Sequence, residues 1–160
     1  MAGNRDYKDL FKTFSDEHVE FLVVGAHAVV FYAEPRYTKD IDIWVRPTEE
    51  NARRVWAALK AFGAPLGQIT PEDFTDSEMV YQIGIEPNRI DILMGIQGVE
   101  FDAAWKNKTE STYDGVPIHI LGRTDLIKSK EAAHRPQDLL DVERLKASDV
   151  PCKASRQAQL

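Results

Sequence analysis

The sequence has little cysteine and no apolar run long enough to cross a membrane. Cys152 is the single cysteine among 160 residues, which excludes an internal disulfide and gives no support to a cysteine zinc cluster. The longest apolar run, residues 21–33, contains Gly25 and is shorter than the roughly 20 residues that a membrane-spanning helix needs. The N-terminal residues carry charges throughout and lack the apolar core of a signal peptide. We therefore expect a cytoplasmic protein without a membrane segment.

An excess of positive charge is also lacking. The chain has 20 lysines and arginines against 26 aspartates and glutamates, a net charge of −6. This balance disfavours non-specific binding to nucleic acid, although a local basic groove stays possible. The length and the 43% apolar content fit one globular domain. We expect that domain to span residues 1–147, with a flexible tail over residues 148–160.

The spacing of apolar residues predicts helices and strands in alternation. Helices are expected at residues 5–17, 26–34, 48–63, 101–105, 123–134 and 136–146. Strands are expected at residues 19–25 and 40–45, and as a pair within residues 79–95 joined by a turn at 86–88. Residues 111–121 are expected to form a small hairpin or two edge strands around Asp114-Gly115. Residues 64–77 are expected to form a polar connection. The mixture, with a strand–helix–strand unit, predicts an α/β (α+β) domain.

Two expected strands carry aspartates where a core strand is normally apolar. In "DIDIWV", Asp40 and Asp42 project to one face because side chains alternate across a strand. The strand "RIDILM" repeats the pattern with Asp91. If these strands are neighbours, three carboxylates converge, repel one another and are relieved by a divalent cation. Oxygen ligands suit Mg²⁺ or Mn²⁺. In the alternative, nearby cations such as Arg89 neutralise the acids.

Gly25 lies between an expected strand and an expected helix, shortly before the paired aspartates. The first amides of a helix lack partners within the helix, and the helix dipole favours anions there. A glycine lets a phosphate approach this backbone. The same glycine is also compatible with a purely steric role in a tight turn. An anion cradle next to a metal site is the combination that a nucleoside triphosphate requires.

These features resemble the signature of the DNA-polymerase-beta-like nucleotidyltransferase superfamily. That signature is hydrophobic-Gly-Gly/Ser, a spacer, Asp-hydrophobic-Asp/Glu and a third acid on a later strand. The corresponding residues are Val24-Gly25-Ala26, Asp40-Ile41-Asp42 and Asp91. Within the superfamily, "PRYTKDIDIWV" and "DLIKSKEAAHRPQDLLDVERL" resemble the small bacterial minimal nucleotidyltransferases and AbiEii-like proteins, some of which occur in toxin–antitoxin pairs. The resemblance covers residues 8–146 and implies a central mixed β-sheet flanked by helices.

The resemblance also implies a site. Asp40, Asp42 and Asp91 would be the catalytic residues and the ligands of Mg²⁺ or Mn²⁺. The nucleotide-binding residues would be Gly25, Ala26, Arg36, Lys39 and Lys130. An exposed surface cation is the alternative for Lys130. Partial neutralisation of the acids is the alternative for Arg36 and Lys39.

Two functions follow from this resemblance. The first is metal-dependent transfer of a nucleoside monophosphate from a nucleoside triphosphate to a protein, RNA or small-molecule acceptor, with a toxin–antitoxin system as one setting. The second is a catalytically weak or inactive binding module that acts through a partner protein. The three acids favour the enzyme. Ala26 favours the module, because Ala26 stands where active members have Gly or Ser and cannot offer a hydroxyl to a phosphate.

Overall fold

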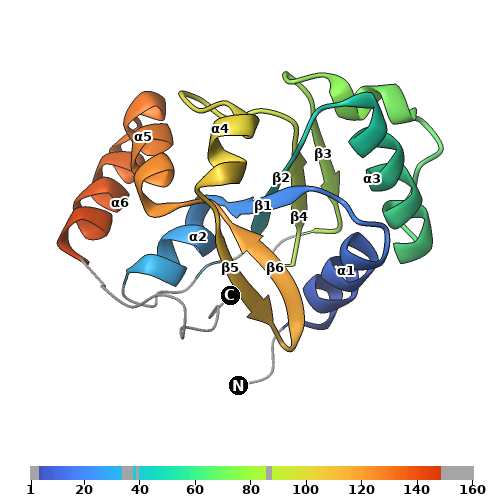
Figure 1. The fold of residues 1–160 in the computed structure, drawn as a ribbon, viewed down its shortest axis with the longest axis horizontal. Helices are drawn as coiled ribbons and strands as arrows, with labels where there is room; N and C mark the ends of the chain where they lie inside the picture. The colour runs from blue at the N-terminus through green and yellow to red at the C-terminus, as the bar shows by residue number, and fades with distance from the viewer. Residues whose placement is uncertain (1–3, 34–37, 39, 86–87, 149–160) are drawn as a thin grey trace.

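Six strands form one mixed sheet in the computed structural model, which describes residues 4–33, 38, 40–85 and 88–148 (Figure 1). In spatial order they are β3 (Val80–Ile83), β4 (Ile90–Leu93), β2 (Ile41–Val45), β1 (Phe21–Val24), β6 (Val116–Ile120) and β5 (Thr109–Tyr113). β2 pairs parallel with β4 and β1 pairs parallel with β6, whereas the other neighbours are antiparallel. The expected fold class, with its mixed central sheet and flanking helices, is confirmed.

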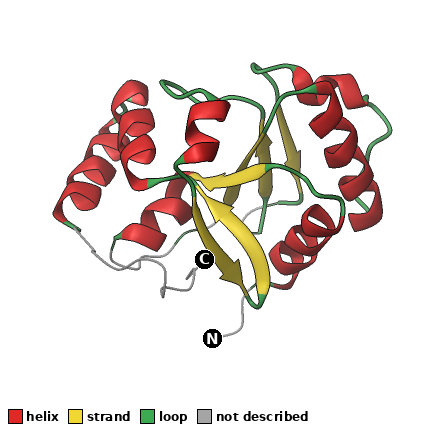
Figure 2. Ribbon diagram, in the orientation of Figure 1, coloured by secondary structure: helices red, strands yellow, loops and turns green. Residues whose placement is uncertain are grey.

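Six α-helices surround this sheet (Figure 2). They are α1 (Arg5–Asp16), α2 (Gly25–Tyr32), α3 (Glu49–Phe62), α4 (Phe101–Lys106), α5 (Arg123–Ala133) and α6 (Pro136–Ala147). Figure 1 shows α1 and α3 together at one end of the sheet and α2, α5 and α6 grouped at the other. The helical group of α2, α5 and α6 therefore stands where β1 and β6 end.

Alternation along β2 separates the core from the acidic face. Ile41, Ile43 and Val45 are fully buried and belong to one apolar cluster with the apolar face of α1. The side chain of Asp42 points the opposite way. The apolar residues of α1 recur at helical spacing and are buried as that spacing predicts: Tyr7, Leu10, Phe11 and Phe14. The core thus fixes which face of β2 presents its carboxylate.

Local signals explain where two of these elements begin and turn. Thr48 caps α3 by accepting a hydrogen bond from the Asn51 amide at 3.3 Å, and Gly63 ends that helix in the left-handed conformation at φ 96°. Asp114 and Gly115 join β5 to β6 with φ values of 47° and 85°. Two successive positive φ values produce the hairpin turn that matches strand twist. The expected hairpin is confirmed.

The start of β2 differs from expectation, because the strand begins at Ile41 and not at Asp40. The Arg89 amide donates to the Asp40 carboxylate at 3.2 Å, and the Arg89 carbonyl accepts from the Ile41 amide at 3.1 Å. The Asp40 side chain thus takes the amide that continued strand pairing would use. Asp40 therefore ends the hydrogen-bonded β2–β4 ladder, and its carboxylate lies beside the first residues of β4.

The expected connection over residues 64–77 contains a short 3₁₀-helix, Pro71–Thr75, that the sequence interpretation did not include. Phe74 is fully buried and anchors it against the core. Asp73 accepts a hydrogen bond from the Thr70 amide at 2.9 Å. The sequence did offer a signal here, namely a proline at the first helical position followed by an acid.

Some expectations lie wholly or partly outside the described residues. They are the end of the helix expected at 26–34, for residue 34, the turn at 86–88, for residues 86 and 87, and the tail over residues 148–160, from residue 149. The binding roles of Arg36 and Lys39 lie entirely outside the described residues. Among the helices that the structure describes, none has the length and apolar content needed to cross a bilayer.

The buried Asn51 joins α3 to Glu20, just before β1, and to Arg46, just after β2. Its Oδ1 accepts from the Glu20 amide at 2.8 Å, and its Nδ2 donates to the carbonyls of Glu20 and Arg46, both at 3.0 Å.

We expect Asn51→Ala to lower the free energy of unfolding by about 2 to 4 kcal/mol, because buried backbone groups lose their partners. Urea denaturation measures this. Asn107→Ala, at an exposed position, is the control and should change stability little; equal effects would contradict the assignment.

Candidate functional site

Two carboxylates lie side by side across the β2–β4 pair. Asp42 is the register partner of Asp91, and on its other side Asp42 is opposite Val24, the last residue of β1. Paired residues point to the same face of a sheet, so the two carboxylates share that face. The two acidic strands are neighbours, which is the condition that the sequence analysis set for their carboxylates to converge. Asp91 is buried, and Asp42 is only partly accessible.

The backbone of Gly25 packs directly against the Asp42 carboxylate. A Cβ placed on Gly25 would overlap that carboxylate, whose Cγ would be 3.0 Å away. Gly25 also has φ 68°, a conformation that glycine adopts at low cost. Glycine is therefore required at this turn for two reasons, close approach and backbone angle. Gly25 begins α2, so the first amides of α2 lie beside the acids.

The neighbouring acids affect the protonation of Asp42. Burial raises the pKa of Asp42 to about 7, and the negative charge and hydrogen bond of Asp91 act in the same direction. The Lys130 ammonium group opposes this increase, whereas the negative charge of Asp40 adds to it. The close carboxylates therefore behave as one electrostatic group. Ionisation of all members costs free energy unless a cation is near.

Arg89 supplies a cation to two of the acids. Its Nε donates to Asp91 Oδ1 at 2.9 Å and its Nη2 to Asp91 Oδ2 at 3.3 Å. Nη2 also lies 3.3 Å from Asp40 Oδ2. The sequence interpretation named Arg89 only as a neutralising neighbour, and this ion pairing is observed.

A cleft of about 870 Å³ opens beside Asp42. Its wall combines polar and apolar residues from the end of β1, the start of α2, the strands β3 and β4, the loop after β4, and helices α5 and α6. They include Gly25, Ala26, Asp42, Val80, Leu93, Ile96, Lys130, Arg135, Asp138 and Asp141. This volume lies within the range of small-molecule sites. Four of the eight predicted site residues therefore line one cleft, and Asp40 and Asp91 lie beside it.

Lys130 is held by two buried aspartates. Its Nζ is 3.3 Å from Asp138 Oδ1 and 3.2 Å from Asp141 Oδ2, and both aspartate side chains are only 1% exposed. The Lys130 side chain is itself 13% exposed. The alternative that Lys130 is an exposed surface cation is therefore wrong. α5 supplies the lysine and α6 supplies both acids, so this cluster also fixes the two helices together.

Asp138 has a second partner in Arg135. Arg135 Nε donates to Asp138 Oδ2 at 2.6 Å, and the Arg135 amide donates to the same oxygen at 3.2 Å. Burial alone would raise the pKa of Asp138, but hydrogen bonds from Arg135 and the charge of Lys130 outweigh it and hold that pKa below its usual value. Asp138 is thus ionised and anchors both cations. The sequence interpretation missed Asp138 and Asp141 as site residues, although their three-residue spacing on α6 is a helical-face signal.

His27 follows Ala26 on α2 and is 2% exposed. Its ring makes an edge contact with the Tyr7 ring, at a centroid distance of 5.9 Å, and lies 3.2 Å from Thr38 Oγ1. His27 therefore packs α2 against α1.

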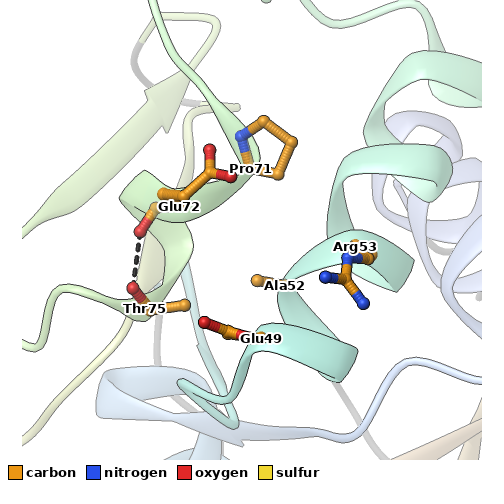
Figure 3. A pocket seen from close by; sticks show the side chains of 6 residues that line it. All are labelled: Glu49, Ala52, Arg53, Pro71, Glu72 and Thr75. Atoms are coloured by element: carbon orange, nitrogen blue, oxygen red, sulfur yellow. Dashed lines mark hydrogen bonds between the residues drawn. The ribbon is translucent and has the colours of Figure 1, made fainter.

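Two further hollows are less suited to a nucleotide. Figure 3 shows the first, about 90 Å³ between α3 and the 3₁₀-helix, in which the Thr75 hydroxyl donates to the Glu72 carbonyl at 2.6 Å. This volume is below that of typical ligand sites. The second, about 420 Å³ at the start of α5, includes a single carboxylate, that of Asp125. Neither offers the described group of adjacent acids.

The residues at the acidic face fit a divalent cation in chemistry. Asp40, Asp42 and Asp91 supply carboxylate oxygens, the ligand type that Mg²⁺ and Mn²⁺ prefer. The negative charge of Asp91, which helps to raise the pKa of Asp42, is what a bound cation would offset. In the described part of the chain, however, no group of three or more Asp, Glu, His or Cys side chains is already arranged to hold a metal ion. The Arg89 guanidinium takes up oxygens of Asp40 and Asp91.

Comparison with known proteins adds a fold class. No protein-family model matches the sequence, and no curated protein matches it. Among solved structures, the lincomycin-bound lincosamide antibiotic adenylyltransferase LnuA matches with a TM-score of 0.57 and 14% identity, over 91% of this chain and 98% of that one. The antibiotic-resistance factor ANT(2'')-Ia matches with a TM-score of 0.59 and 12% identity, over 93% and 85%.

A third similar structure is that of a protein from Thermotoga maritima assigned as a nucleotidyltransferase. It has a TM-score of 0.54 and 19% identity, over 89% of both chains. The chain therefore has the fold of nucleotidyltransferases, as the resemblance of its motifs predicted. At these identities the likeness concerns the fold.

The raised pKa of Asp42 predicts a pH-dependent stability change. Its pKa is about 7 in the folded protein and near 3.8 when unfolded, so the folded state loses stability as the pH rises between these values. We expect Asp42→Asn, measured by urea denaturation with a chelator present, to stabilise the protein by about 1 to 3 kcal/mol above pH 7. The gain should vanish near pH 4. Asp9→Asn, on the exposed side of α1, should show no such trend, and a pH-independent effect of Asp42→Asn would refute the coupling.

The buried partners of Lys130 give a second prediction. We expect Asp141→Asn to lower the free energy of unfolding by about 3 kcal/mol, because it leaves a largely buried ammonium group with half of its counter-charge. The exposed pair of Lys146 and Glu131, at 3.4 Å, provides the control. Glu131→Gln should cost less than about 0.5 kcal/mol. Equal effects of the two variants in chemical denaturation would show that the buried cluster does not stabilise α5 against α6.

Proposed function

We propose that the protein is a metal-dependent nucleotidyltransferase that moves a nucleoside monophosphate from a nucleoside triphosphate to a hydroxyl group of an acceptor. The observation that carries this proposal is the position of Asp42, which is paired with Asp91 on one side and packed against the Gly25 backbone on the other. Adjacent acids next to a helix start combine a cation site with an anion site.

The proposed triphosphate site is the cleft, where backbone amides and a lysine lie close to the acidic face. The amides of Gly25 and Ala26 begin α2, where the positive end of the helix dipole attracts an anion. Within the described residues, no side-chain cap bonds these amides. Lys130 adds a positive charge from α5, held in place by Asp138 and Asp141. Ala26 contributes only its backbone, since its side chain has no hydroxyl.

In the proposed reaction, the acceptor oxygen forms a bond to the α-phosphorus of the triphosphate. The bond from that phosphorus to the bridging oxygen breaks, and pyrophosphate leaves with its electron pair. Asp91 accepts the proton of the acceptor hydroxyl, and Asp40 and Asp42 complete the set of carboxylates that would hold the metal. Bound Mg²⁺ or Mn²⁺ would lower the pKa of the acceptor hydroxyl and stabilise the charge of the leaving group.

A small molecule is the first acceptor class to test. The cleft has apolar walls at Val80, Leu93 and Ile96 beside its charged side, which suits a compound with both apolar and hydroxyl parts. The similar fold of a lincosamide antibiotic adenylyltransferase supports the same choice. A protein side chain or an RNA end, and a toxin–antitoxin setting, stay predictions of the sequence resemblance.

A binding module that acts through a partner protein is the second candidate. Two observations favour it: Ala26 offers no hydroxyl at the start of α2, and Arg89 engages two of the three acids. The two candidates differ in whether a labelled nucleotide is transferred.

We expect Mg²⁺ with a nucleoside triphosphate, at about ten times its dissociation constant, to raise the melting temperature by several degrees. Asp42→Asn should reduce this shift, because the site loses one carboxylate that would hold the metal. With an α-labelled triphosphate and a panel of hydroxyl compounds, proteins and RNAs, Asp91→Asn should reduce transfer by about a hundredfold or more, as loss of a general base does. Asp91→Asn should retain part of the thermal shift, because Gly25 and Lys130 still face the triphosphate.

Asp9→Asn is the matched control, because it removes an exposed aspartate from α1 and should change neither thermal shift nor transfer. Absence of a thermal shift with all four ribonucleoside triphosphates, at millimolar metal and nucleotide, would contradict the proposed enzyme function. Label that reaches no acceptor in a cell lysate, together with stable capture of one partner protein, would instead support the binding module.

A further inference from the structure

Arg89 makes a set of contacts that triphosphate binding does not explain. Three contacts of its guanidinium reach both oxygens of Asp91 and one oxygen of Asp40, at 2.9 to 3.3 Å. Its backbone amide donates to the other oxygen of Asp40 at 3.2 Å. The side chain is 28% exposed, and those of Asp40 and Asp91 are 14% and 12% exposed. The three groups form a compact cluster at the edge of the β2–β4 pair.

The position of Arg89 is fixed by the strands themselves. Its carbonyl accepts from the Ile41 amide at 3.1 Å, which ties the residue to the start of β2. It stands two residues before Asp91, so its side chain lies along the same face of the sheet. A guanidinium is a planar fork that fits a carboxylate with two parallel hydrogen bonds. The arrangement therefore follows from the β2–β4 register and needs no further element to hold it.

The same oxygen atoms cannot serve a guanidinium and a metal ion in full at the same time. Both Asp91 oxygens accept hydrogen bonds from Arg89, and a divalent cation would use lone pairs on these atoms. A divalent ion and a guanidinium at about 4 Å also repel each other by roughly 2 kcal/mol even in water, and more in a partly buried site. Metal binding at Asp91 therefore requires Arg89 to move away.

We propose that Arg89 is an internal counter-ion that occupies the Asp40–Asp91 position and competes with the metal ion for it. The proposal deepens the proposed function and rests on it, because it concerns the same acids. Arg89 keeps the acidic cluster neutralised before metal arrives. Because a metal ion must first displace Arg89, the site fills only at a higher metal concentration than it would without this residue.

A plain positioning role for Arg89 would have the opposite sign. If Arg89 served only to orient Asp40 and Asp91 for a metal, its removal would weaken metal binding. If it competes, its removal strengthens metal binding while it destabilises the protein without metal. Affinity for a metal ion alone therefore separates the two roles without any assay of transfer.

The experiment measures binding of Mn²⁺ alone to the full chain by electron paramagnetic resonance. Arg89→Gln should bind Mn²⁺ about tenfold more tightly than wild type, and its melting temperature should be lower without metal but rise more on addition of Mn²⁺. Arg89→Lys keeps one charge without the fork, so it should retain more stability and bind Mn²⁺ a few-fold more tightly. This variant decides the sign if Arg89→Gln does not fold.

Arg46→Gln is the matched control. Arg46 follows the other end of β2 and also pairs with two carboxylates, with Nε 3.0 Å from Glu20 Oε1 and a second pairing to Asp102. Its loss should lower the melting temperature and leave Mn²⁺ affinity unchanged. Weaker or unchanged Mn²⁺ binding in both Arg89 variants would overturn the counter-ion proposal alone. Absence of Mn²⁺ binding in every protein, wild type included, would overturn the proposed function with it.

Discussion

The parallel pairing of β2 with β4 is the constraint on which the candidate site depends. In this register Asp42 stands opposite Asp91, with Ile41 and Ile43 opposite Ile90 and Ile92. Because side chains alternate, a slip by one residue would place carboxylates in the core and isoleucines in the cleft. Burial of the isoleucines therefore selects the register, and the register brings the acids together. The apolar core and the acidic face are two consequences of one strand pairing.

Concentrated negative charge makes this arrangement costly, and the surrounding elements offset that cost from two sides. Arg89 neutralises Asp40 and Asp91 at one side, and Lys130 exerts its positive charge on Asp42 from α5. Lys130 in turn is held by Asp138 and Asp141. Positive and negative groups thus alternate from the start of β4 to α6.

Sequence patterns predicted the parts of the fold that are set by short-range chemistry. The apolar spacing of α1, the capping threonine of α3 and the Asp114-Gly115 turn each act within a few residues. Helices near residues 5–17 and 48–63 and the hairpin within 111–121 accordingly appear where the sequence predicts them. The 3₁₀-helix was missed because a five-residue turn with one buried phenylalanine gives little periodicity. The start of β2 differed by one residue because the Asp40 side chain accepts the Arg89 amide, a contact between distant segments.

For the site, the sequence by itself determined the chemical groups and the strand faces. Asp42 and Asp91 had to leave the core, because alternation leaves no other place for them once the isoleucines are buried. Only the tertiary structure decided their partners. Strand order placed Asp42 between Gly25 and Asp91, and the packing of α5 on α6 buried Lys130 between two aspartates. Contacts of this kind join residues far apart along the chain, and no local pattern records them.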